Sequence, residues 1–124
     1  MKSWAKDIFL AGLLILVAVP AFAHHGNAAI DNTKQITVTG TITDWVWANP
    51  HSWLKMDVKN EKGEIDHWVF EENAPATLVG YGWTRHMFKP GDVATVTARV
   101  AKNGALVGRP SKIVVNGKTY GGFN

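Results

Sequence analysis

Histidines are the residues of this chain best suited to chemistry, and three of them could form a metal site. His24 and His25 follow the A-x-A cleavage signal at residues 21–23, so processing would leave His24 with a free α-amino group. Amine and imidazole nitrogens are available near neutral pH and suit copper(II) above other first-row divalent ions. A second imidazole, from His51 or His25, would complete the donor set. The alternative is that two polar residues follow a cleavage site at a frayed terminus.

A second group of candidates lies in the string Trp-Ala-Asn-Pro-His-Ser-Trp, residues 47–53. Pro50 restricts Asn49 to an extended or turn conformation and places His51 at the entry to the next strand. Exposed indoles of Trp47 and Trp53 could stack on a flat ligand or a sugar ring. The alternative is that both tryptophans pack in the fold and His51 caps a loop through backbone hydrogen bonds.

Charged residues further along the chain border the same predicted patch. Glu71 and Glu72 end a predicted strand, where neighbouring side chains point to opposite faces, so they are not a catalytic carboxylate pair. We expect both on a solvated edge, with Glu71 beside Trp53. Arg85 is a candidate anion contact because its planar guanidinium suits such groups. The predicted ligand-binding residues are Trp47, Asn49, His51, Trp53, Glu71 and Arg85.

The string around Arg85, residues 82–92, also has a structural interpretation. Trp83, Met87 and Phe88 have the spacing of a helical turn that plugs one end of a barrel. In that arrangement Arg85 faces outward.

Several common catalytic motifs are absent from the sequence. The chain has no cysteine, no phosphate-binding glycine loop and no H-E-x-x-H motif. Ser52 stands next to His51, but adjacent residues of a strand diverge and do not form a nucleophile and base pair. We therefore expect a non-catalytic protein.

The composition indicates one small globular domain that follows a leader. With 124 residues, 46% hydrophobic and 19% charged, the chain fits a single folded domain and not a disordered one. Residues 1–23 combine Lys2, Lys6, an apolar run over residues 8–19 and the A-x-A signal, which predicts a cleaved secretory signal peptide. The run is shorter than the roughly 20 residues of a membrane span; an uncleaved anchor is the alternative.

Export would set both the compartment and the partners. We expect a periplasmic or secreted protein that keeps no stable membrane anchor and binds a small ligand or an envelope protein. A net charge of +3 is too mild to indicate a nucleic-acid partner. Since the chain has no cysteine, the core alone must stabilise the fold.

Strand patterns follow a polar N-terminal lead over residues 24–34. Residues 35–47 alternate β-branched side chains and predict a long bent strand, with Gly40 at a position for a bulge or bend. Residues 52–59 and 64–71 predict two strands of a hairpin, joined by a turn at residues 60–63. This turn sets the register, in which the numbers of two paired residues add up to 124. This register puts His67 opposite Asp57 and collects the apolar residues Leu54, Met56, Val58, Trp68 and Phe70 on the other face.

The second half of the chain adds a helix and two strands. Residues 74–81 predict a short helix capped by Asn73, and residues 93–100 and 105–115 predict strands. Three strands, a short helix and two strands are the order of an OB-fold, a five-stranded Greek-key barrel. We therefore predict a mainly β, OB-like barrel over residues 35–124. A small β-sandwich or an open sheet with one helix is the alternative.

Three motifs carry a resemblance to a known family. They are the His24-His25 start, the Asn49-Pro50-His51 turn and the Gly82-Trp83-Thr84-Arg85 string. Through them the sequence resembles small exported bacterial proteins grouped as the domain of unknown function 6152, over nearly the whole mature chain. Gly26-Asn27 replaces the Ser-Phe pair associated with such proteins. The resemblance implies an envelope localisation and an OB-like barrel, and it supplies no activity.

Two functions are compatible with these residues. The first is an exported, non-catalytic binding module whose ligand contacts the patch around Trp47, His51, Trp53 and Glu71. The alternative is a periplasmic copper-binding protein that uses His24 with His51 or His25.

Overall fold

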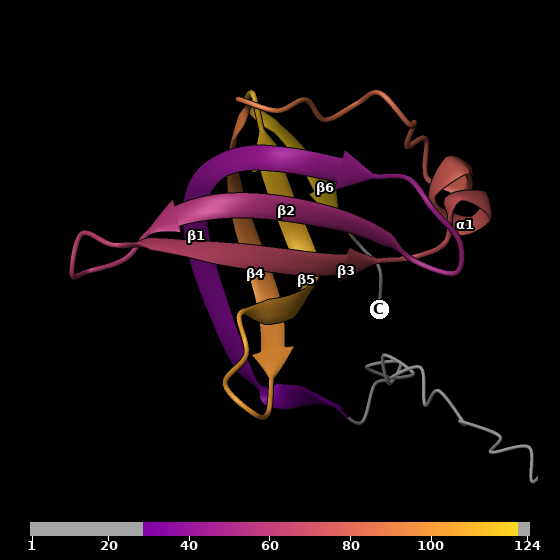
Figure 1. Ribbon diagram of the computed structural model, residues 1–124. Coiled ribbons are helices and arrows are strands. Elements are labelled where there is room, and N and C mark those ends of the chain that lie inside the picture. Colours follow the sequence, from indigo (N-terminus) through magenta and orange to yellow (C-terminus); the bar gives the residue numbers. More distant parts are fainter. Residues whose placement is uncertain (1–28, 122–124) are drawn as a thin grey trace, which may run out of the picture.

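The computed structural model describes residues 29–121, which contain six strands and one short helix (Figure 1). In chain order they are β1 (Ile30–Val46), β2 (Ser52–Lys59), β3 (Ile65–Glu72), α1 (Pro75–Gly80), β4 (Val93–Ala101), β5 (Val107–Val115) and β6 (Lys118–Gly121). The predicted order of three strands, a helix and two strands is confirmed, and β6 is an addition to it. The predicted signal peptide and residues 24–28 lie outside the described residues.

The strands close into a barrel. The sheet order is β3-β2-β1-β4-β5-β6, and a parallel pairing of β3 with β5 joins its two sides. The long β1 bends around the barrel and serves both halves, since it pairs with β4 through its first part and with β2 through its last (Figure 1). The mainly β, OB-like architecture predicted from the sequence is confirmed.

β1 begins earlier than the pattern predicts. Ile30 pairs with Ala101, and the Lys102 amide donates a hydrogen bond to the Ala29 carbonyl, so the strand starts five residues before Gln35. The register shifts between Ile30 and Gln35, where an irregular polar stretch interrupts the alternation of side chains. That interruption is why this part of the strand reads as a polar lead in the sequence.

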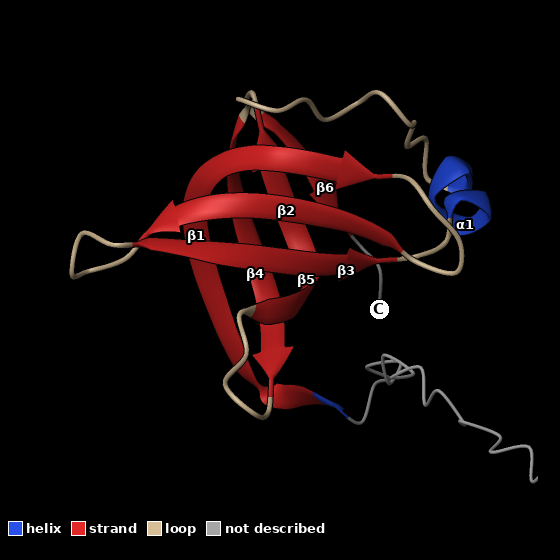
Figure 2. Cartoon of the chain, in the orientation of Figure 1, coloured by secondary structure: helices blue, strands red, loops and turns tan. Residues whose placement is uncertain are grey.

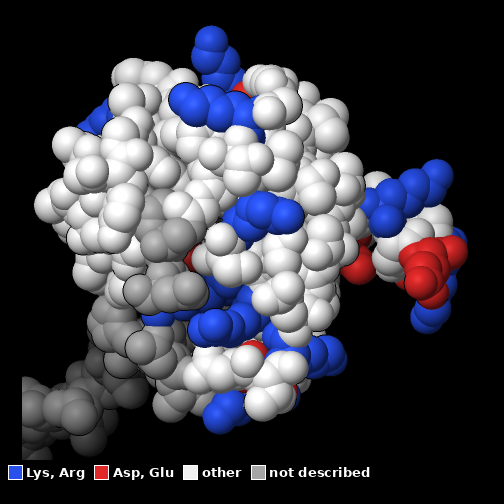
Figure 3. Space-filling view, turned by 180° about the vertical axis from the view of Figure 1, so that it is seen from behind, with Lys and Arg blue, Asp and Glu red and all other residues white. Residues whose placement is uncertain are grey.

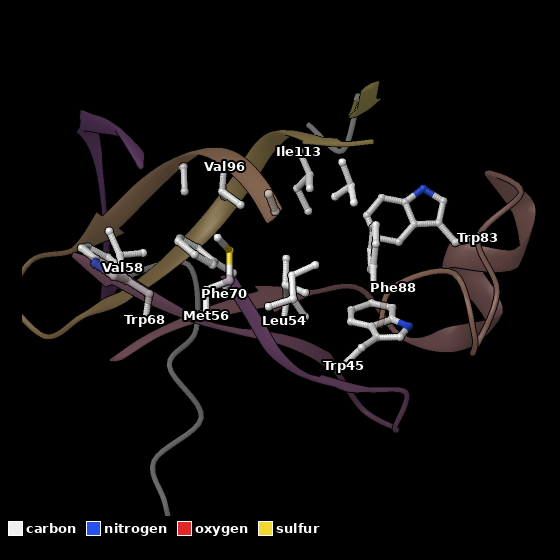
Figure 4. Packing of buried hydrophobic residues seen from close by; sticks show 14 of the residues in the cluster. Trp45, Leu54, Met56, Val58, Trp68, Phe70, Trp83, Phe88, Val96 and Ile113 are labelled. Atoms are coloured by element: carbon white, nitrogen blue, oxygen red, sulfur yellow. The ribbon is translucent and has the colours of Figure 1, made fainter. Parts of the chain in front are cut away.

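The hairpin of β2 and β3 has the predicted register. Ser52 pairs with Glu72 and Lys59 with Ile65, so paired numbers sum to 124 throughout. Its inward face joins the hydrophobic core, whose members include Leu54, Met56, Val58, Trp68, Phe70, Val96 and Ile113 (Figure 4). His67 Nδ1 lies 2.7 Å from Asp57 Oδ1, which confirms the predicted cross-strand pair.

The helix and the following loop close one end of the barrel (Figure 2). The N-cap of α1 is Ala74, which makes no side-chain capping hydrogen bond, so the prediction that Asn73 caps the helix is wrong. The Asn73 carbonyl instead accepts a hydrogen bond from the Ser52 amide and continues the β2–β3 ladder. No helix among residues 29–121 has the length and apolar character to cross a membrane.

The predicted plug is present but is built from turns and not from a helix. Trp83 and Phe88 are buried, and their rings contact Trp45 with centroids 5.9 and 5.2 Å from the Trp45 ring (Figure 4). The Trp45 indole donates to the Thr84 carbonyl at 3.3 Å, which ties β1 to this loop. Arg85 faces outward, as predicted.

Gly40 of β1 lies directly against the backbone of β2. A Cβ atom at this position would lie 2.3 Å from the Asp57 carbonyl oxygen and 2.8 Å from Val58 Cγ2. The register shift between β1 and β2 falls between Ile42 and Asp44, so the bulge occurs a few residues after Gly40. Gly40 therefore permits the close approach of two strands that the bent barrel requires.

We predict that Gly40→Ala lowers the free energy of unfolding by about 2 to 3 kcal/mol, because the new methyl group overlaps backbone atoms that cannot move aside. Urea denaturation followed by tryptophan fluorescence measures the effect. Gly80→Ala is the matched control: a Cβ atom at Gly80 would have no other atom within 4 Å, and stability should stay the same or rise by about 0.5 kcal/mol. Equal stability of the two variants would contradict the close-approach argument.

Candidate functional site

A cavity of about 440 Å³ opens where β3 and β5 separate. The two strands pair only at Val69 with Val107 and at Phe70 with Gly108, and the residues that follow on each strand line the cavity. β1, α1 and β4 supply the remaining walls. The lining residues are Ile30, Asn32, Glu71, Glu72, Asn73, Thr77, Tyr81, Arg99, Arg109, Pro110 and Ser111.

Glu72 is a buried carboxyl group on the inward face of β3. Alternation along the strand places it on the same side as Trp68 and Phe70, and it is only 3% exposed. Burial raises the pKa of the Glu72 carboxyl from 4.5 to about 8, the charge of Arg109 opposes this rise, and the nearby Glu71 adds to it. The group is thus mostly neutral at pH 7, and its Oε1 has no hydrogen-bond partner.

Glu71 is buried as well, although it points to the other side of the strand. Glu71 Oε1 lies 3.0 Å from His51 Nδ1, and the same His51 nitrogen lies 3.3 Å from the Glu72 carbonyl oxygen. Glu71 Oε2 has no hydrogen-bond partner. The predicted solvated edge is therefore wrong for both glutamates, which are 4% and 3% exposed. The end of β3 lies at the wall of the cavity, among residues of β1, α1, β4 and β5, and not at a free edge of the sheet.

Two arginines lie opposite each other on the cavity wall. Arg99 of β4 and Arg109 of β5 are direct cross-strand partners. Like charges in that relation destabilise a sheet, so the pair is an unusual choice for a purely structural position. Seen from behind the view of Figure 1, Lys and Arg side chains are spread over this face of the molecule, and several lie near one another in its lower half (Figure 3).

The predicted ligand-binding residues divide into two groups in the structure. His51 and Glu71 are in contact, and Trp53 pairs with Glu71 across the β2–β3 ladder, with its ring centroid 6.4 Å from that of His51. The other three predicted residues, Trp47, Asn49 and Arg85, do not contact this group. Trp47 packs edge-on against Trp45, Asn49 is exposed in the preceding turn, and Arg85 is exposed with no ion pair to any residue from 29 to 121.

Of the predicted copper ligands, only His51 can be placed. His24 and His25 lie outside the described residues. Among residues 29–121, no group of three His, Cys, Asp or Glu side chains is arranged to hold a metal ion. The histidine brace stays a prediction.

Sequence reasoning missed most of the cavity lining, although some signals were present. Glu72 follows Trp68 and Phe70 at a spacing of two, which puts an acidic residue on the core face of the predicted hairpin. Arg99 and Arg109 are recognisable as partners only once the register of the β4–β5 hairpin is known. Nothing local indicates that the end of β3 meets β5, because that contact joins distant parts of the chain.

We predict that Glu72→Gln stabilises the protein at alkaline pH. The wild-type carboxyl stays protonated in the folded state up to about pH 8 but ionises near 4.5 when unfolded. The free energy of unfolding therefore falls as the pH rises between these two values. Gln cannot ionise, so the variant should exceed the wild type by roughly 2 to 4 kcal/mol at pH 8, with little difference near pH 4.5.

Urea denaturation across this pH range measures the difference. His51, Glu71, Arg99, Arg109 and Tyr81 are present in both proteins, so the comparison isolates Glu72. Glu61→Gln, in the exposed hairpin turn, is the matched control and should show no such trend. Parallel pH curves for the wild type and Glu72→Gln would contradict the buried, protonated carboxyl group.

The fold resembles solved structures of single-stranded DNA binding proteins. A structure of the mitochondrial protein Rim1 from S. cerevisiae matches with a TM-score of 0.50 and 10% identity, covering 67% of this chain and 93% of that chain. A selenomethionine-labelled structure of Rim1 has a TM-score of 0.44 and 16% identity, with 66% and 92% covered. At these identities the likeness is one of fold alone.

Sequence comparison places the chain in a family. A comparison with curated proteins finds no match. Residues 11–110 match the family of unknown function DUF6152, which confirms the resemblance carried by the three motifs. The chain belongs to the DUF6152 family.

Proposed function

We propose that the protein is an exported, non-catalytic binding module whose small polar ligand occupies the cavity between β3 and β5. One observation carries this proposal: two glutamates that line the cavity are almost fully buried, and each keeps one oxygen without a hydrogen-bond partner. Buried polar groups are nearly always paired, and an unpaired one costs about 1 to 3 kcal/mol. A ligand with polar groups that hydrogen-bond to Glu71 Oε2 and Glu72 Oε1 would remove this cost.

The size and construction of the cavity support the same function. Ligand pockets have volumes of about 300 to 1,000 Å³, and this cavity has about 440 Å³. Most of its polar residues stand on strands of the barrel, and rigid elements hold binding groups more accurately than loops do. Its location differs from the predicted patch of Trp47 and Trp53, although Glu71 belongs to both.

A catalytic role has little support among the lining residues. Glu71 and Glu72 point to opposite sides of β3, so they do not act as an acid and base on one substrate atom. Ser111 donates its hydroxyl hydrogen to the Thr97 carbonyl at 3.3 Å, and not to a histidine or carboxylate base. Binding without chemistry is the simpler function for this arrangement.

Nucleic acid is not part of the proposal. Proteins that bind single strands stack successive bases on exposed aromatic side chains along a basic groove. Among residues 29–121, Trp45, Trp68 and Trp83 are buried in the core and Trp47 packs against it, whereas Trp53 is half-buried and Tyr81 is exposed. The likeness to Rim1, at 10% identity, is one of fold alone and does not carry a nucleic-acid ligand over to this chain.

We predict that filling the cavity abolishes ligand binding. In Thr77→Trp a large side chain on α1 would occupy the cavity, whereas in Ala76→Trp the same side chain would stand on a neighbouring exposed position that does not line it. A panel of polar metabolites is screened by changes in amide chemical shifts of the folded protein. We expect shifts at residues 71–73 and 109–111 in the wild type and in Ala76→Trp, and none in Thr77→Trp.

Three results of the chemical-shift experiment would contradict the proposed function. Shifts confined to Trp47 and Trp53 would place binding on the outer patch, and binding that survives Thr77→Trp would exclude the cavity. A panel in which no compound shifts residues 71–73 or 109–111 would count against the proposal too.

Copper binding is a second candidate function, favoured by the orientation of His51. Metal-ligating histidines commonly have one ring nitrogen bonded to a carboxylate while the other nitrogen binds the metal. His51 has the first half of this arrangement, since its Nδ1 is 3.0 Å from Glu71 Oε1. Because residues 29–121 hold no three-residue metal cluster, the other ligands would be His24 and His25.

We predict that copper(II), if bound, requires the free amine of His24. Protein that begins at His24 is titrated with copper(II) and followed by electron paramagnetic resonance. One additional residue before His24, or the change His51→Gln, should weaken binding by about tenfold or more. Equal affinity of the extended chain would reject the brace.

A further inference from the structure

We propose that the ligand of the cavity is a small organic anion that also carries a hydroxyl or amino group. In this arrangement Arg99 and Arg109 hold the anionic group, and one of the two glutamates that line the cavity, Glu71 or Glu72, accepts a hydrogen bond from the donor group. The inference rests on the proposed function, because it names the chemical class of the ligand for the same cavity.

The anionic group is indicated by the two arginines. They are direct cross-strand partners on β4 and β5, and both line the cavity. Arg99 has no ion pair with any other residue in the described part of the chain. An anion between the two guanidinium groups would convert a repulsive pair into a two-sided clamp, which is the geometry that arginine offers to carboxylate and phosphate groups.

The donor group is indicated by the two glutamates on the facing strand. Glu71 Oε2 and Glu72 Oε1 are buried, lack partners and belong to residues that line the cavity. An ionised Glu71 only accepts hydrogen bonds, and the carboxyl group of Glu72 keeps acceptor capacity when it is protonated, so a hydroxyl or ammonium group of the ligand can donate to either residue. The existing contact of Glu71 Oε1 with His51 holds that carboxylate in place from the outer side.

Simpler ligands satisfy only half of this site. An inorganic anion would pair with the arginines but would leave the two carboxyl oxygens without donors. A simple amine would pair with the glutamates and leave the arginines opposite each other. A hydroxy acid, a sugar acid or an amino acid has both groups within a few bonds, so it can bridge the wall formed by β4 and β5 and the end of β3.

Three dicarboxylates test whether the donor group of the ligand contributes to binding. Succinate, malate and aspartate have the same carbon chain and the same two carboxylates, and they differ only in carrying a hydrogen, a hydroxyl or an ammonium group at one carbon. Isothermal titration calorimetry with the processed, folded protein gives the three affinities. We expect malate or aspartate to bind about tenfold more tightly than succinate, the effect of one hydrogen bond to a charged or buried acceptor.

A pair of arginine variants tests the anionic half. Arg99→Gln removes one side of the clamp, and Arg85→Gln removes an exposed arginine that does not line the cavity. We expect Arg99→Gln to weaken the tighter ligand by about tenfold or more and Arg85→Gln to leave its affinity unchanged. Circular dichroism of both variants confirms that the fold is retained.

The results that overturn the inference differ from those that overturn the proposed function. Equal affinities for the three dicarboxylates would reject the donor half, and equal affinities of the two arginine variants would reject the anionic half. Failure of all three to bind, while another compound of the metabolite panel binds in a manner that Thr77→Trp abolishes, would reject this ligand class alone. Failure of the whole panel would reject the proposed function with it.

Discussion

Two parallel residue pairs between β3 and β5 close this barrel, and the candidate site depends on where that contact stops. Gly108 permits the contact: a Cβ atom there would lie 3.0 Å from the Arg99 carbonyl oxygen and 3.3 Å from the Phe70 ring. One residue further along each strand come Glu71 and Arg109, both of which line the cavity. Closure of the barrel and formation of the cavity are thus consequences of one short pairing.

Local patterns in the sequence predicted the local structure well. The turn at residues 60–63 was sufficient to assign every pair of the β2–β3 hairpin, because turn geometry sets the register of an antiparallel pair. β6 was missed although Asn116-Gly117, with φ of 51° and 75°, is a strong signal for a two-residue hairpin turn. Asn73 was a plausible helix cap by residue type, but its backbone carbonyl takes part in the β2–β3 ladder by accepting a hydrogen bond from the Ser52 amide.

The site was predictable only in part, because its components come from separate regions of the chain. The proximity of His51 and Glu71 agrees with the predicted hairpin, because His51 directly precedes the strand that pairs with Glu71. The burial of the two glutamates depends on β1, α1 and β5, whose positions no local pattern specifies. Charged residues at strand ends are usually solvated, and here long-range packing overrides that tendency.

The shared strand β1 has a consequence for the kinetics of folding. Its first half pairs with β4 some sixty residues later, as at Thr37 and Thr97, and its second half pairs with the adjacent β2. Contacts between distant residues form slowly, since a long loop must close before the pairing can stabilise it. The cavity draws its walls from Ile30 through Ser111, so it is complete only when the slowest of these loops has closed.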